Sequence, residues 1–74
     1  MKYIVIELQT AANGSVANIV TSHDTREQAE SKYYNVLSSA AVSQVPCHAA
    51  VIMDSEGGFI DAHSYQHPVE ESGE

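Results

Sequence analysis

Histidine and cysteine are the side chains of this chain that could carry metal or nucleophilic chemistry. His63 and His67 are four residues apart, which suits zinc on a helix, but they fall in a predicted strand, where that separation is about 13 Å. Cys47 and His48 are adjacent in an apolar strand, so their side chains point to opposite faces and cannot form a catalytic dyad. His23 has no cysteine or carboxylate cluster near it in sequence. We therefore expect no metal site, no cofactor and no enzyme activity.

Charge and size restrict the possible partners. Three Lys and Arg residues stand against ten Asp and Glu residues, and the formal net charge is −7. No basic stripe could neutralise phosphates, so we expect no duplex nucleic acid partner. A chain of 74 residues is near the size at which one core is only just sufficient, so a homo-oligomer, a dimer or larger, is expected to bury a further face.

The N-terminal segment and the single cysteine bear on location. Residues 1–10 contain an apolar run that Glu7 interrupts, and this run is too short for a signal peptide or a membrane span. Cys47 is the only cysteine, so it forms no internal disulfide. We expect a cytoplasmic protein without a membrane partner.

One segment, from Asp24 to Ser43, has clear helix signals. Asp24 can accept hydrogen bonds from the first-turn amides as the N-cap, and Glu27 follows three residues later as in a capping box. An apolar stripe with helical spacing comes next, formed by Ala29, Tyr33, Val36, Leu37 and Ala40. The sequence therefore predicts an amphipathic helix that covers one face of a sheet.

Four segments have the β-branched and aromatic content of strands: Lys2–Gln9, Val16–Ser22, Cys47–Asp54 and Phe59–His67. Asn13-Gly14 predicts the first hairpin turn, and Ser55 to Gly58 predicts the second. A right-handed crossover through the helix places the first strand between the second and third, which gives the antiparallel order 2-1-3-4. We predict an α+β domain over residues 1–68, with the order ββαββ and one helix packed on one face, and an acidic disordered tail over residues 69–74.

Side-chain alternation assigns the strand residues to faces. We expect the helix to cover the face of the first strand that carries Ile4, Ile6 and Leu8. The uncovered face would then carry aromatic and apolar residues, where a solvated face usually carries Thr, Lys and Glu. This pattern predicts an oligomer interface formed by Tyr3, Val5, Phe59, His63 and Tyr65. The alternative is that these residues make ordinary cross-strand pairs.

The outer side of the predicted helix offers a second candidate surface. Tyr34 lies about 100° around the helix from Tyr33 and is expected to be exposed. Arg26 and Lys32 lie on or beside the same helix. An aromatic ring with a guanidinium is a common way to hold a nucleotide, so Arg26, Lys32 and Tyr34 are candidate ligand-binding residues for a nucleotide-derived small molecule.

Four segments carry a resemblance to a known group of proteins: MKYIVIELQT, NGSVANIVTSHD, REQAESKYYNVLSSAAVS and VPCHAAVIMDSEG. Over the chain up to about Pro68, the sequence resembles a family of short uncharacterised proteins that prophages and gut phages of Firmicutes encode near tail and lysis genes. The resemblance includes no known catalytic signature, so it implies a phage origin, with the host bacterial cytoplasm as the location, and indicates no particular activity.

That origin implies one of two non-enzymatic roles. The first is an anti-defence accessory protein that, as an oligomer, sequesters a nucleotide-derived immune signal or blocks a host defence protein. The alternative is a protein-interaction module of virion assembly or lysis that binds no small ligand.

Overall fold

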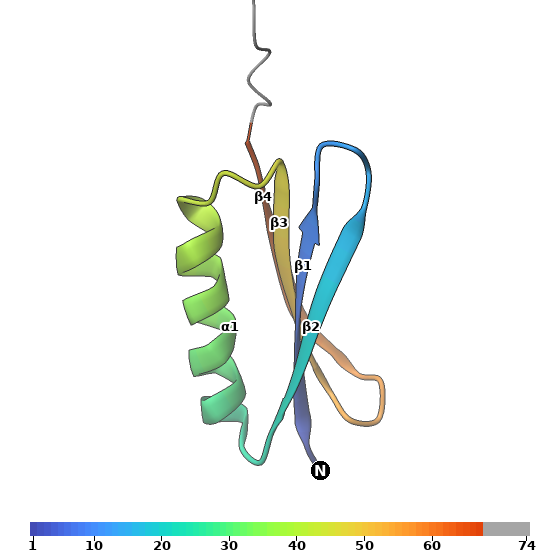
Figure 1. The fold of residues 1–74 in the computed structure, drawn as a ribbon. Coiled ribbons are helices and arrows are strands. Elements are labelled where there is room, and N and C mark those ends of the chain that lie inside the picture. Colours follow the sequence, from blue (N-terminus) through green and yellow to red (C-terminus); the bar gives the residue numbers. More distant parts are fainter. Residues whose placement is uncertain (68–74) are drawn as a thin grey trace, which may run out of the picture.

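The computed structural model describes residues 1–67, which form a four-stranded sheet with one helix on one side (Figure 1). In chain order the elements are β1 (Tyr3–Thr10), β2 (Val16–His23), α1 (Arg26–Ala41), β3 (Cys47–Asp54) and β4 (Phe59–Gln66). All neighbouring strands are antiparallel, and the sheet order is β2-β1-β3-β4. The predicted α+β class, element order and sheet order are therefore confirmed. The tail predicted for residues 69–74 lies outside the described residues.

Both hairpins turn at the glycines that the sequence indicates. Gly14 has a φ of 90° and Gly57 a φ of 89°, a left-handed conformation that glycine adopts without strain. In the second turn, Asp54 Oδ1 accepts hydrogen bonds from the amides of Glu56 and Gly58, at 2.9 and 2.7 Å. The aspartate side chain thus closes the connection between β3 and β4.

The helix begins one residue later than the predicted cap implies. Thr25, and not Asp24, is the N-cap: its backbone is extended and its hydroxyl accepts a hydrogen bond from the Gln28 amide at 3.2 Å. Asp24 instead forms an ion pair with Lys2, which joins the start of β1 to the end of β2. At the other end of α1, His67 Nε2 donates to the Ala40 carbonyl at 2.8 Å, and the Ser43 amide donates to the same carbonyl at 3.2 Å.

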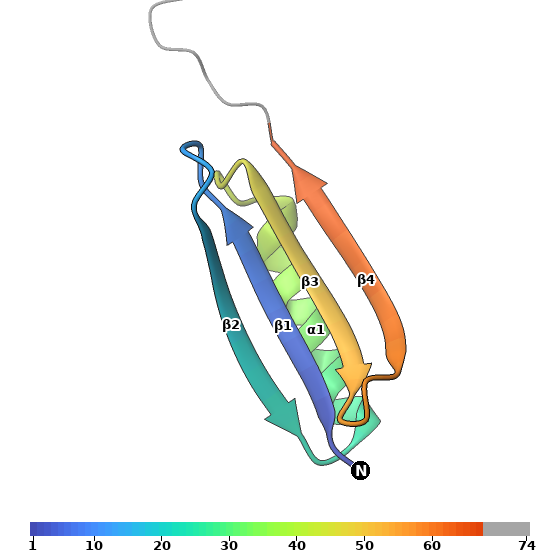
Figure 2. The same ribbon diagram turned by 90° about the vertical axis from the view of Figure 1, so that its right-hand side faces the viewer.

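The core lies between α1 and the two central strands. Figure 2 shows the helix behind β1 and β3, seen through the sheet. The buried apolar cluster consists of Val5, Ala29, Tyr33, Val36, Ala50 and Ile52. The predicted helix stripe is confirmed, because four of its five residues are buried and Leu37 packs against the cluster.

The predicted faces of β1 are wrong. Val5 is 1% exposed and faces the helix, and Tyr3 packs against the same cluster. Ile4, Ile6 and Leu8 lie on the opposite side of the sheet. The helix approaches closely because fully buried alanines, Ala29 and Ala40 on α1 and Ala50 on β3, line this contact, and Val5 lies beside Ile52 on that side.

Candidate functional site

The sheet face turned away from α1 carries no charge. We call it the open face, and Figure 2 looks directly onto it. Strand register places four residues of each strand on it: Ile4, Ile6, Leu8 and Thr10 of β1, Val16, Asn18, Val20 and Ser22 of β2, Cys47, Ala49, Val51 and Met53 of β3, and Phe59, Ala62, Ser64 and Gln66 of β4. None of these residues is an acid, a base or a histidine.

The ionisable groups of the strands are segregated on the other side. Every Asp, Glu and His within the four strands lies on the helix side of the sheet: Glu7, His23, His48, Asp54, Asp61 and His63. On the open face, by contrast, Val16 and Val20 are each 58% exposed and Phe59 is 69% exposed. An extended exposed apolar surface is unusual for a monomer and typical of a protein-contact site.

The open face has one projection and one hollow. A bulge in the β3–β4 pairing brings Phe59 opposite Met53, while Ile60 packs against the core. Further along the same two strands the side chains are small, and they leave a hollow of about 390 Å³ whose lining includes Ala49, Val51, Ala62 and Ser64. The face is therefore uncharged and mainly apolar, with the Phe59 ring raised near one end of β4 and a shallow depression toward the other end.

A groove of about 580 Å³ runs between α1 and β4 on the helix side of the sheet. Its lining includes Tyr33 and Tyr34 of the helix and Asp61, His63 and Tyr65 of β4. The His63 and Tyr65 rings meet edge to face, with centroids 4.8 Å apart. Burial raises the pKa of the Tyr33 hydroxyl, and the nearby Asp61 carboxylate raises it further, so this hydroxyl stays protonated at neutral pH.

The structure brings two of the three predicted ligand-binding residues together: Arg26 and Tyr34 line one small pocket of about 110 Å³, whose lining does not include Lys32. Arg26 and Tyr34 lie on the β4 side of the helix, where the Arg26 side chain pairs with Glu30 at 3.1 Å. Lys32 is two residues from Tyr34, which is about 200° around the helix. Its charge acts instead on Glu7, near the middle of the sheet. An anionic ligand in that small pocket would meet one arginine already paired to a glutamate, and the carboxylate of Asp61.

The five predicted interface residues are also divided. Phe59 is the only one of them on the open face. Tyr3 and Val5 lie on the helix side, and Val5 is enclosed there. His63 and Tyr65 line the groove. The open face is mainly apolar, but β1 presents Ile4, Ile6 and Leu8 to it in place of Tyr3 and Val5.

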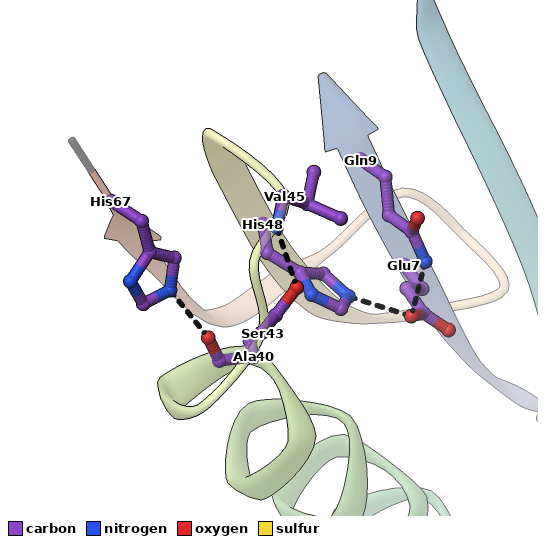
Figure 3. A network of polar contacts seen from close by, with 7 residues as sticks. All are labelled: Glu7, Gln9, Ala40, Ser43, Val45, His48 and His67. Carbon is purple, nitrogen blue, oxygen red and sulfur yellow. Dashed lines mark hydrogen bonds and ion pairs between the residues drawn. The ribbon is translucent and has the colours of Figure 1, made fainter. Parts of the chain in front are cut away.

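A buried polar pair lies beneath the C-terminal half of the helix (Figure 3). The His48 side chain is 5% exposed and the Glu7 side chain 15% exposed, and His48 Nε2 donates to Glu7 Oε2 at 2.7 Å. Gln9 Nε2 donates to the same oxygen at 3.0 Å. Desolvation raises the pKa of Glu7, but the hydrogen bonds from His48 and Gln9 and the charges of His48 and Lys32 outweigh it and hold this pKa below 4.5.

The helix covers this pair, and only a small part of either side chain is accessible. His48 Nδ1 is buried and has no hydrogen-bond partner among the described residues. Sequence reasoning missed the pair because the two residues are 41 positions apart. Only the β1–β3 register, which places His48 opposite Gln9 and next to Glu7, could have indicated it.

Comparison with known proteins adds no family. No protein-family model matches the sequence, and no curated protein or solved structure matches it significantly. Among residues 1–67, no helix has the length and hydropathy needed to cross a membrane. In the same part of the chain, no three His, Cys, Asp or Glu side chains form a group that could hold a metal ion.

Proposed function

We propose that this chain is a non-enzymatic protein-interaction module, encoded by a phage, whose working surface is the open face. One observation carries the proposal: the four positions of each of the four strands on the open face are mainly apolar and include no charged residue, while the strand acids and histidines lie on the other side. Selection for solubility alone would place charged residues on an exposed sheet face as well as on the helix side.

The shape of this surface favours a protein over a small molecule. A small ligand needs a concave site that encloses most of its surface. The open face is a sheet with a shallow hollow over β3 and β4, and it offers contact area in place of enclosure. The shape of the open face therefore favours the role of a protein-interaction module over the role of a protein that sequesters a nucleotide-derived signal.

The test compares two glutamate substitutions at exposed valines. Val20→Glu introduces a charge on the open face, and Val42→Glu makes the same change at the C-terminal end of α1, where the valine is 82% exposed. Tagged wild type and both variants are expressed in a Firmicutes host that carries a prophage, and the captured proteins are identified. We expect wild type and Val42→Glu to capture the same partner and Val20→Glu to lose it. Identical capture by all three would place the working surface elsewhere.

A second candidate function is the capture of an aromatic small molecule in the groove between α1 and β4. It is favoured by the 59% exposed Tyr34 ring and by the His63–Tyr65 pair that lines the same groove. A panel of cyclic dinucleotides, cyclic trinucleotides and ADP-ribose derivatives tests it by thermal shift. A ligand at 100 times its Kd should raise the melting temperature by roughly 10 °C or more. Tyr34→Ala should abolish this shift and Phe59→Ala should leave it; no shift with any ligand would refute binding of these classes.

A further inference from the structure

We propose that the open face is covered by a second copy of this chain, in a two-fold symmetric dimer that packs sheet on sheet. This inference rests on the proposed function, because it names the protein that the open face binds. Its basis is the complete absence of charge from the open face of a chain whose formal net charge is −7.

Charge distribution favours a second copy over a basic partner. A basic partner would be recognised by carboxylates, and the open face has none. Two acidic copies repel each other wherever their acids meet, yet the open faces can meet without bringing any acid into the interface. The strand carboxylates then point outward on both sides of the dimer, and sheets packed about 10 Å apart keep them beyond the screening length of about 8 Å in physiological salt.

The size of the face fits a stable dimer. Four strands about 4.8 Å apart, each of eight residues with a rise of about 3.3 Å, give a face of roughly 19 by 26 Å. This footprint is about 490 Å² per copy and about 1,000 Å² for the two copies together, which is the lower limit for a specific interface. The covered apolar layer would also supply a second core to a chain with only a small cluster of buried side chains.

The projection and the hollow specify how the two copies meet. One row of cross-strand neighbours runs across the middle of the face: Val20, Ile6, Val51 and Ala62. Phe59 lies on one side of this row, and the hollow at Ala49 and Ser64 lies on the other. Consider a two-fold axis that lies in the interface and runs parallel to this row. It places β4 of one copy against β4 of the other copy, and the two strands then run in opposite directions. Each Phe59 ring then enters the hollow of the other copy, and the contact occurs twice.

Four variants in two matched pairs test the dimer. Val20→Glu and Phe59→Ala alter the open face, while Val42→Glu and Tyr34→Ala make the same kinds of change at exposed positions on α1 and its C-terminal end. Sedimentation equilibrium of the full chain over a range of concentrations gives the mass and the dimer Kd. Far-ultraviolet circular dichroism checks that each variant is folded. Because Val20 is 58% exposed in the single chain, its glutamate stays hydrated in the monomer and the fold should be kept.

We expect wild type to have twice the 8.0 kDa mass of one chain. Val20→Glu should raise the dimer Kd by about 100-fold or more, since each dimer would bury two carboxylates. Phe59→Ala should raise the dimer Kd by about 10-fold or more, since the substitution removes two buried rings from each dimer. Val42→Glu and Tyr34→Ala should leave it unchanged.

Two outcomes would overturn the inference. One is a wild type that stays monomeric at millimolar concentration, and the other is a dimer that Val20→Glu does not weaken. A dimer weakened by Val20→Glu but not by Phe59→Ala would overturn the two-fold arrangement. A monomeric wild type that still loses its captured partner with Val20→Glu would overturn the second copy alone, and the open face would then serve a different protein.

Discussion

Glu7 is the acid whose replacement should change how the stability of this protein depends on pH. Its carboxylate lies under the helix and accepts hydrogen bonds from His48 at 2.7 Å and from Gln9 at 3.0 Å. The substitution Glu7→Gln keeps the size of the side chain and one acceptor oxygen but removes the charge. It therefore tests the charge of the pair with little change in packing.

The magnitude follows from the two hydrogen bonds. A hydrogen bond to a charged group contributes about 1.5–3 kcal/mol to stability, and one between neutral groups about 0.5–1.5 kcal/mol. The neutral variant avoids the cost of burying a carboxylate, so we expect a net loss of about 1–2 kcal/mol at pH 7. For a domain of this size, that loss lowers the melting temperature by roughly 4–16 °C.

The pH dependence has a definite sign. The pKa of Glu7 in the folded protein lies below 4.5, its ordinary value, which we take for the unfolded chain. The unfolded chain therefore binds a proton first as the pH falls, and acid favours unfolding. The stabilisation from Glu7 is complete above about pH 4.5 and is lost as the pH falls through the folded pKa. Glu7→Gln should lose this part of the acid sensitivity.

Urea denaturation at pH 7 and at pH values down to 3 measures both effects. Glu56→Gln is the matched control, because Glu56 is exposed in the β3–β4 turn; its unfolding free energy should follow that of wild type at every pH. The reasoning fails if Glu7→Gln is as stable as wild type at pH 7. It fails equally if wild type and Glu7→Gln lose stability in parallel on acidification.

Two further substitutions test local features of the fold. Thr25→Ala should cost about 1 kcal/mol of unfolding free energy, since it removes the cap of the Gln28 amide. Asp24→Ala should cost little, because the Asp24 side chain is 72% exposed and its ion pair with Lys2 lies at the surface. Equal losses in urea denaturation would show that Thr25 does not cap the helix. Gly58→Ala should destabilise by more than about 1 kcal/mol, because an added Cβ would lie 2.3 Å from an Asp54 carboxylate oxygen, and moving that carboxylate would break its hydrogen bonds to the Glu56 and Gly58 amides. An unchanged melting temperature for Gly58→Ala would mean that the turn relaxes without cost.

Local sequence patterns determined the elements of this protein and their order. The strands, the two turns and the helix stripe all follow from alternation, glycine and helical spacing, because these signals act between residues close in the chain. The order β2-β1-β3-β4 followed from the hand of one crossover and the antiparallel hairpins. The cap was misplaced by one residue because Asp24 and Thr25 can both accept a first-turn amide, and Asp24 is drawn to Lys2 in the fold.

Only the tertiary structure decided which face of the sheet the helix covers. Hydrophobic alternation favours the side of β1 that carries Ile4, Ile6 and Leu8, because the other side carries Glu7 and Gln9 beside Val5, yet the helix covers that other side. Close packing of the alanines on α1 against β3 settles the choice. The same long-range register places Glu7 beside His48 and puts all the charged strand residues on the helix side of the sheet. A pairing between residues 41 positions apart leaves no local trace, because each strand pattern is compatible with either side of the sheet.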